Sequence, residues 1–290
     1  MVDTMATPIA SLAVTGSTGN LGGRVARRLA AAGVPQRLLV RDPSRAPHLP
    51  ATEIAVASYG NPRAARTALD GIETVFMVSA AEQADRVREH TTFVDAAAAA
   101  GVSRLVYLSF YGAAPDATFT LARDHWATEQ HLKATGLGFT ILRDNLYLDF
   151  LPLMVGEDGF IRGPADDGRV AAVAQDDIAD VAVAVLRAPQ AHDKATYDLT
   201  GPEAFTMAEA AETLSRKTGR TVRFHDETIP EAYESRASYG APDWQVDAWV
   251  STYTAIAAGE LAGVSDAVAR IAGHPPLSLE ALLDRTTDLS

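Results

Sequence analysis

Short apolar runs alternate with longer segments of helical period from residue 9 to about residue 145. The runs are rich in β-branched residues and the longer segments in alanine, a pattern typical of βαβ units and a parallel sheet. Six strands are predicted in this region, at 9–15, 36–40, 53–57, 73–78, 103–109 and 138–142. Four crossover helices are predicted between them, each closed by a glycine, at 20–33, 61–71, 85–101 and 121–136. Because βα crossovers are nearly always right-handed, we expect an α/β fold with a doubly wound parallel sheet and helices on both faces.

The pattern changes after Leu142, where glycine, proline and aspartate punctuate short apolar pieces. The segment 169–189 returns to a strand and an amphipathic helix, and "ATYDLTG" predicts another strand. From Thr206 onward, mostly helical segments surround one strand, "TVRFHD". We therefore predict a main domain formed by residues 1–145 and 170–200. The smaller, mainly helical C-terminal lobe would comprise residues 146–169 and 201–290.

The composition is that of an ordinary globular protein of 290 residues, with 47% hydrophobic and 21% charged residues. With 25 basic and 37 acidic residues, the net charge of −12 argues against nucleic acid and anionic membranes as partners. The chain has no cysteine, which excludes disulfides, thiolate metal sites and cysteine nucleophiles. The first residues show no secretory pattern, and no run of about 20 apolar residues follows, so we expect a cytoplasmic protein.

A glycine-rich turn, "TGSTGNLGGRV", joins the first predicted strand to the first helix. Gly16 allows the tight turn, Gly19 lets backbone amides approach a pyrophosphate, and Gly22 lets helix and strand pack closely. The helix N-terminus adds favourable partial charge, so the turn predicts a Rossmann-type NAD(P)-binding domain rather than a plain tight turn. The predicted cofactor-binding residues of the turn are Gly16, Ser17, Thr18, Gly19, Asn20 and Leu21.

The end of the second predicted strand indicates which dinucleotide is bound. An acidic side chain there binds a ribose 2′-hydroxyl, whereas an arginine accommodates a 2′-phosphate. The residue after "RLLV" is Arg41, and Arg45 lies one turn further on. These two residues favour NADPH over NADH. Asp42 argues against it, and a solvated surface arginine is the alternative for Arg41.

Several motifs together resemble the NmrA-like group of atypical short-chain dehydrogenase/reductases, in particular the quinone oxidoreductase 2-type NADPH-dependent reductases. They are the glycine turn, "LVRDPSRA", "VYLS", an H-x-x-x-E helix, "FTILRDNLY", "YDLTGPEAFTMAEAAETLSRKTGR" and "IAGHPPLSLEALL". The resemblance covers nearly the whole chain. It implies hydride transfer from NADPH to a small, quinone-like molecule, and it is compatible with a homodimer.

Ordinary short-chain dehydrogenases use a Tyr-x-x-x-Lys pair to protonate the developing alkoxide. Where that pair would fall, this chain has Leu121-x-x-x-His125, followed by Glu129. Interconversion of ordinary alcohols and ketones is therefore not expected. A quinone forms a far better anion, so holding the two rings in contact can supply most of the catalysis.

Candidate residues gather at the predicted carboxyl ends of the strands. Ser109 could bind substrate or ribose, or simply form a strand-end turn. Tyr111 could flank the nicotinamide, or lie exposed in a loop. His125 could bind a cofactor ribose or donate a proton, or be satisfied by Glu129 one turn away.

The family pattern adds four more positions. It implies that Asn145 and Tyr147, in "RDNLY", approach the nicotinamide and the substrate. It also implies that Val78 and Ser79 contact the cofactor ribose through their backbone.

No metal site is predicted, because the seven histidines lack ligand spacing and the pair His125 and Glu129 lacks a third convergent ligand. Two other functions stay open. One is a regulatory protein that senses NADP(H) without turnover, as the NmrA name implies. The other is a reductase of a biosynthetic pathway that acts on a polycyclic intermediate.

Overall fold

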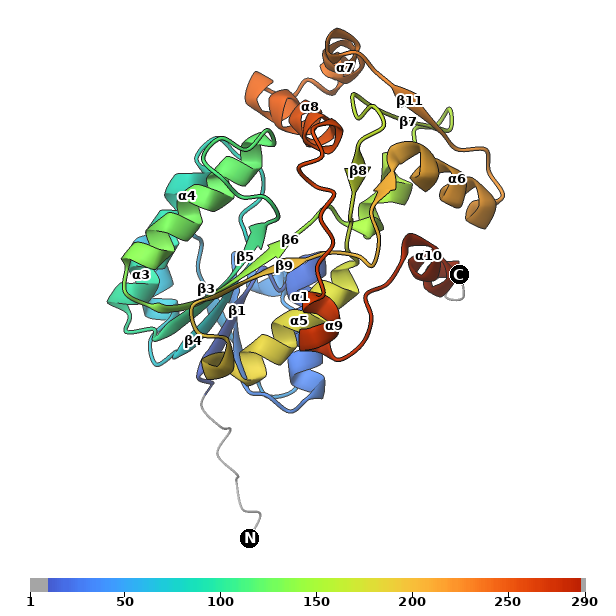
Figure 1. The fold of residues 1–290 in the computed structure, drawn as a ribbon. Helices are drawn as coiled ribbons and strands as arrows, with labels where there is room; N and C mark the ends of the chain where they lie inside the picture. Colours follow the sequence, from blue (N-terminus) through green and yellow to red (C-terminus); the bar gives the residue numbers. More distant parts are fainter. Residues whose placement is uncertain (1–9, 288–290) are drawn as a thin grey trace.

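The computed structural model describes residues 10–287, and its centre is a seven-stranded parallel sheet (Figure 1). The strands, in their order across the sheet, are β3 (Thr52–Val56), β2 (Gln36–Val40), β1 (Leu12–Thr15), β4 (Thr74–Met77), β5 (Arg104–Phe110), β6 (Gly138–Asp144) and β9 (Ala195–Leu199). Every neighbouring pair is parallel. The order reverses between β1 and β4, which confirms the predicted doubly wound, Rossmann-type fold.

The predicted strands match the observed ones to within a few residues. The first begins at Leu12 rather than at residue 9, which lies outside the described residues. The fifth and sixth continue to Phe110 and Asp144, so the sheet reaches further toward the candidate residues than expected.

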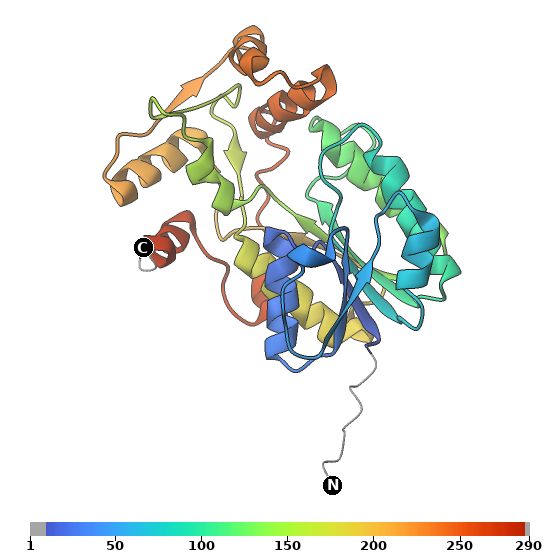
Figure 2. The same ribbon diagram turned by 180° about the vertical axis from the view of Figure 1, so that it is seen from behind.

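Helices cover both faces of the sheet, as Figures 1 and 2 show. They are α1 (Asn20–Ala31), α2 (Pro62–Ala68), α3 (Arg86–Ala99), α4 (Thr120–Ala134), α5 (Gln175–Arg187) and α9 (Ala267–Ala272). Successive strand residues point to opposite faces. Val14 and Phe76 therefore pack with α1, α5 and α9, while Ala13 and Val75 pack with α2, α3 and α4.

A smaller lobe with its own apolar core lies beyond the carboxyl ends of β5 and β6 (Figure 2). Its helices are α6 (Met207–Thr218), α7 (Ile229–Arg236), α8 (Asp243–Ala257) and α10 (Leu279–Thr287), and its strands are β7 (Phe160–Gly163), β8 (Arg169–Val170), β10 (Phe205–Thr206) and β11 (Arg223–Asp226). Short 3-10 helices complete the described chain at η1 (Pro43–Arg45), η2 (Leu148–Met154), η3 (Pro189–His192) and η4 (Ala237–Tyr239). The strand expected near residue 170 is only the two-residue β8, which pairs with β10 rather than with the main sheet.

The predicted division into two lobes stays a prediction, with one complication at α9. This helix lies in the range assigned to the smaller lobe, yet Ala267 and Val268 are buried in the core that packs on α1 and α5. The chain therefore returns to the main domain before α10 joins the smaller lobe. None of the helices within residues 10–287 has the length and apolar character needed to cross a bilayer.

Gly22 sets how closely α1 approaches β1. A Cβ atom at this position would lie 2.4 Å from the carbonyl oxygen of Gly16 and 2.8 Å from that of Thr15. Both atoms are backbone, so they cannot turn aside as a flexible side chain would. Only glycine permits this separation of helix and strand.

We expect Gly22→Ala to lower the free energy of unfolding by about 1–3 kcal/mol, the usual cost of overpacking. Urea unfolding measures the change. Gly60→Ala is the matched control, because the nearest atoms there belong to the flexible side chain of Glu89. The control should change stability by about 0.5 kcal/mol or less, and equal losses in the two variants would contradict the steric argument.

Candidate active site

The glycine turn leaves the N-terminus of α1 open for an anion. Gly16 has a φ of +65°, and its carbonyl oxygen accepts a hydrogen bond of 2.9 Å from the amide of Gly19. Thr18, Gly19 and Asn20 are exposed. No side chain caps the helix and no acidic residue lies in its first turn, so its amides and positive dipole end face no competing group.

Two residues of the turn point inward instead. Leu21 is buried in the core under α1, so only its backbone can face a ligand. The Ser17 hydroxyl is buried and has no hydrogen-bond partner among the described residues. Such an orphaned polar atom beside an open helix N-terminus fits a turn built around a phosphate-bearing group.

Arg41 lies at the same edge of the sheet as this turn, because it follows β2, the parallel neighbour of β1. The Tyr59 hydroxyl bonds the side chain of Thr15, the last residue of β1. Burial raises the pKa of Tyr59, and the hydrogen bond with Thr15 and the charge of Arg41 oppose that rise. Arg41 is exposed and directly follows β2, as predicted.

Asp42 turns away from that position. Its carboxylate accepts hydrogen bonds from the backbone amide and the hydroxyl of Ser44, at 2.9 Å and 2.7 Å, and so caps η1. Its hydrogen bond with the Ser44 side chain lowers the pKa of Asp42. The acidic residue that argued against NADPH is therefore occupied within its own turn.

Val78 and Ser79 follow β4, the neighbour of β1 at the point where the strand order reverses. The Val78 amide donates to Thr15 and its carbonyl accepts from Tyr59, so both backbone groups already have partners within the protein. The Val78 side chain instead covers Gly16. Ser79 lines a large cavity.

This cavity has a volume of about 1080 Å³ and lies between the carboxyl edge of the sheet and the smaller lobe. Aromatic side chains dominate its wall: Phe110, Phe119, Tyr147, Phe150, Phe160, Tyr239, Trp249 and Tyr253. At its rim, the carboxylate of Glu82 accepts hydrogen bonds from Gln245 and from the indole of Trp249, at 3.1 Å and 3.2 Å. These two bonds tie the loop before α3 to α8 across the opening.

A buried polar chain forms one wall of the cavity. The Arg86 guanidinium donates to Nε2 of His125 at 2.9 Å, and Nδ1 of His125 lies 3.0 Å from the Tyr107 hydroxyl. Arginine has only donors, so Nε2 must accept and the proton of His125 must sit on Nδ1. His90 is fixed in the same way, because its Nε2 accepts from the Ala80 amide at 2.8 Å.

Both imidazoles are therefore neutral. Burial, reinforced by the charge of Arg86, lowers the pKa of His90 to about 3 and that of His125 well below its usual value. The expectation that His125 donates a proton near neutral pH is wrong on this geometry. It is satisfied by Arg86 and Tyr107, and not by Glu129 as the alternative interpretation held.

Ser109 does not face the cavity. Its hydroxyl is fully buried and donates to Glu129 at 2.6 Å, so the expected contact with substrate or ribose is wrong. Glu129 also forms a two-pronged ion pair with Arg143, at 2.8 Å and 2.7 Å. A carboxylate this deeply buried must be compensated, and Ser109 is part of that compensation.

Tyr111 and Asn145 hold the two lobes together. The Tyr111 hydroxyl occupies the space next to Gly263, and Tyr111 is not among the residues of the cavity wall. The Asn145 side chain is fully buried, donates to the carbonyl of Leu261 at 3.0 Å and accepts from the Leu146 amide at 2.8 Å. Tyr111 is thus not at the cavity, where the prediction placed it. Asn145 borders the cavity, but its side-chain amide is already hydrogen-bonded within the protein.

Tyr147 lines the cavity as predicted, and it brings with it a residue that the sequence analysis missed. Its hydroxyl donates to Oδ2 of Asp144 at 2.6 Å. Asp144 ends β6, is only 3% exposed and also lines the cavity. The signal was present in "ILRD", where an aspartate closes a buried strand at the ligand-binding edge.

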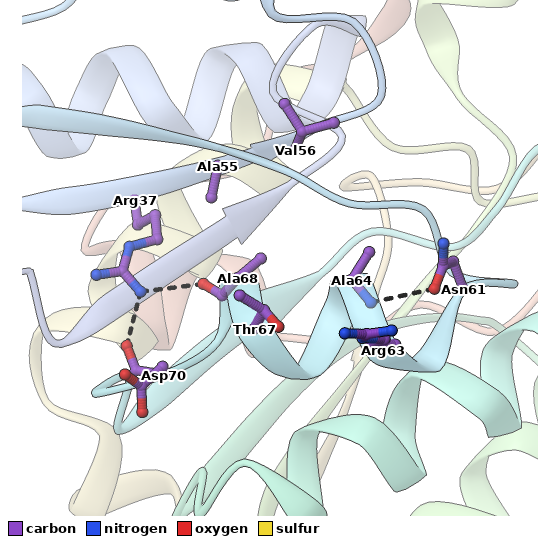
Figure 3. Close-up of a pocket in the computed structure, with 9 residues that line it drawn as sticks. All are labelled: Arg37, Ala55, Val56, Asn61, Arg63, Ala64, Thr67, Ala68 and Asp70. Atoms are coloured by element: carbon purple, nitrogen blue, oxygen red, sulfur yellow. Dashed lines mark hydrogen bonds between the residues drawn. The ribbon is translucent and has the colours of Figure 1, made fainter.

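A second hollow, shown in Figure 3, lies on the outer side of the sheet between β3 and α2. There Arg37 donates to the carbonyls of Ala68 and Asp70, and Asn61 caps α2. This hollow contains none of the predicted site residues. Within residues 10–287, no cluster of three or more acidic and histidine side chains is arranged to hold a metal ion.

Comparison with known proteins agrees with this geometry. A family described as NAD(P)H-binding matches residues 16–189. An NAD(P)H azoreductase of Xenophilus azovorans is 33% identical over 90% of this chain and 93% of its own length. An NmrA-like family domain-containing oxidoreductase of Aspergillus flavus is 28% identical over 91% of each chain.

Quinone oxidoreductase 2 of Escherichia coli is similar in both sequence and structure. It is 30% identical over 92% of this chain and 96% of its own length. Its crystal structure in complex with NADPH superimposes with a TM-score of 0.86 and covers 95% of this chain and 99% of that one.

The neutral His125 makes the stability of the protein depend on pH in a defined direction. The pKa of His125 is lowered in the folded state. Below about pH 6 the unfolded chain therefore binds a proton at this imidazole and the folded chain does not, so the free energy of unfolding falls as the pH falls. His125→Gln keeps an acceptor for Arg86 and removes the titration. We expect it to lessen the slope of unfolding free energy against pH by about 1.2 kcal/mol per unit between pH 6 and 5.

Urea unfolding across this pH range measures the two slopes. His90 contributes to both proteins alike and cancels in the comparison. Identical slopes would contradict the neutral state of His125.

Proposed function

The chain belongs to the NAD(P)H-binding family, as an NmrA-like NAD(P)H-dependent oxidoreductase, and from that premise we propose that it reduces quinones or similar planar, electrophilic acceptors with NADPH. The observation that carries the proposal is the aromatic cavity of about 1080 Å³ that begins at Ser79. Ser79 follows β4, which neighbours β1 and its glycine turn. A dinucleotide held at that turn and extended across the strand ends therefore reaches the cavity.

The glycine turn fits the pyrophosphate of such a cofactor. The uncapped N-terminus of α1 offers free amides, and the absence of acidic residues in its first turn avoids repulsion. Exposed Arg41, with Asp42 engaged by Ser44, favours a 2′-phosphate and hence NADPH. When bound, the dihydronicotinamide would supply a hydride.

The cavity wall suits a flat aromatic acceptor. Its aromatic side chains offer stacking faces for a flat ring, and the hydrogen bonds of Glu82 join the loop before α3 to α8 at the cavity wall. Holding the acceptor ring against the cofactor then converts a bimolecular encounter into a positioned reaction. Sensing of redox state requires only that the cofactor binds, whereas turnover also requires a cavity for an acceptor. The large aromatic cavity therefore favours turnover over regulation.

Anaerobic oxidation of NADPH with a panel of benzoquinones and naphthoquinones tests the proposal directly. We expect acceptor-dependent turnover, and we expect Gly19→Val to abolish it because a branched side chain in the turn hinders the approach of a pyrophosphate to the backbone amides. Circular dichroism of Gly19→Val checks that it is folded. Binding of NADPH by the wild type without turnover on any acceptor would favour the sensor function instead.

Arg41→Ala tests the choice of dinucleotide. A charge-assisted contact contributes about 1.5–3 kcal/mol, so NADPH affinity should fall about 10- to 100-fold while NADH affinity changes little. Calorimetric titration gives both constants. Arg220→Ala, an exposed arginine beyond α6 in the smaller lobe, is the matched control for lost charge. Equal losses for both dinucleotides would show that Arg41 does not read the 2′-phosphate.

A further inference from the structure

We propose that Asp144, with Tyr147, is the proton donor of the reductase, delivering to the acceptor oxygen the proton that accompanies each hydride. The proposal rests on the reductase function proposed above and adds to it a catalytic residue in the cavity. The observations that carry it are the position of Asp144, the groups around it and its protonation state.

Asp144 is placed at the cavity by the main sheet rather than by a loop. It is the last residue of β6, between Phe110 of β5 and Leu199 of β9 in the register. Both neighbours are uncharged, and the carboxyl group accepts a hydrogen bond from the Tyr147 hydroxyl. A group on a strand that is hydrogen-bonded on both sides keeps its position when an acceptor enters.

No cation neutralises this carboxyl group. Among the described residues, no arginine, lysine or histidine nitrogen forms an ion pair with Asp144, although it is almost completely buried. The arginines of the cavity wall pair elsewhere: Arg86 with Asp124 and His125, Arg162 with Asp158, and Arg236 with Glu227. Two further acids, Glu82 and Glu157, lie exposed at the cavity wall, and His125 is neutral.

A buried and unpaired carboxyl group favours its neutral form. Burial raises the pKa of Asp144 to about 8, and the hydrogen bond from Tyr147 and the charge of Arg86 only partly oppose that rise. At neutral pH the group therefore carries a proton. A proton held at a pKa near the working pH is well matched to general acid catalysis.

Arg86 supplies a positive charge close to the proton donor. It lies close enough to Asp144 and Tyr147 to lower the pKa of both groups, and its Nη1 is buried without a hydrogen-bond partner in the described chain. This nitrogen lies 3.7 Å from the carboxylate of Asp124 and makes no hydrogen bond within residues 10–287, so it keeps a donor that would stabilise negative charge developing on an acceptor oxygen.

The step balances as follows. The C–H bond of the dihydronicotinamide breaks and its electron pair reduces the quinone, which becomes the hydroquinone monoanion. The O–H bond of Asp144 then breaks as an O–H bond forms on the acceptor oxygen, leaving hydroquinone and the Asp144 carboxylate. Tyr147 donates its hydrogen bond to that carboxylate, and a proton from water restores the acid.

Asp144→Asn tests the assignment with the shape of the side chain preserved. General acid catalysis contributes about 100-fold or more, so kcat for quinone reduction should fall about 100-fold while NADPH affinity stays the same. In the wild type kcat should fall above about pH 8 as Asp144 ionises, and in the variant this limb should be absent. The loss should be larger for acceptors whose reduced form is the stronger base.

Tyr147→Phe gives a shift that a merely structural role would not produce. The Tyr147 hydrogen bond lowers the pKa of Asp144, so its removal should move the falling limb to higher pH. The infrared carbonyl band of the protonated carboxyl, absent from Asp144→Asn, follows the same titration without turnover. An Asp144 that is ionised at pH 6 would overturn the proposal.

The outcomes distinguish the reductase function from the proton-donor role of Asp144. If the wild type turns over and Asp144→Asn matches its kcat and pH profile, the proton-donor assignment is wrong and the reductase function stands. If the wild type binds NADPH but reduces no acceptor, the reductase function fails, and the role of Asp144 fails with it.

Discussion

The parallel direction of all seven strands is the constraint on which the rest of the molecule depends. Parallel strands end at one common edge, so the glycine turn after β1, Val78 after β4, and Asp144 at the end of β6 are brought to the same side of the sheet. The backbone hydrogen bonds of the sheet fix these positions, whichever side chains stand there. The smaller lobe lies over this edge, and the open cavity between them is lined by aromatic side chains.

Much of this arrangement could be predicted from the sequence, because local patterns determine it. Alternating strand and helix periods gave the sheet, and the spacing of Gly16, Gly19 and Gly22 gave the dinucleotide turn. The position of Arg41 followed from the end of β2. Each of these features depends on residues that are close in sequence, and their backbone geometry is strongly limited by residue type.

The side-chain roles at the cavity could not be predicted in this way, since they depend on partners far apart in the chain. Ser109 was expected at the ligand, but its hydroxyl is required by Glu129, which is itself buried by packing of α4 on β5. His125 was expected to titrate, but Arg86, 39 residues away, keeps it neutral. Asp144 was passed over because nothing local shows that its carboxyl group is buried without a cation.

The path of the chain between the two cores has a consequence for how such enzymes diversify. The buried residues of the smaller core come from 148–174, 207–261 and 277–283, while α5, β9 and α9 between them belong to the main core. The aromatic cavity therefore cannot be exchanged as one contiguous block of gene sequence. Recombination with a relative would have to cut at several places at once, so the shape of the cavity is more readily changed by single substitutions in its aromatic wall than by domain shuffling.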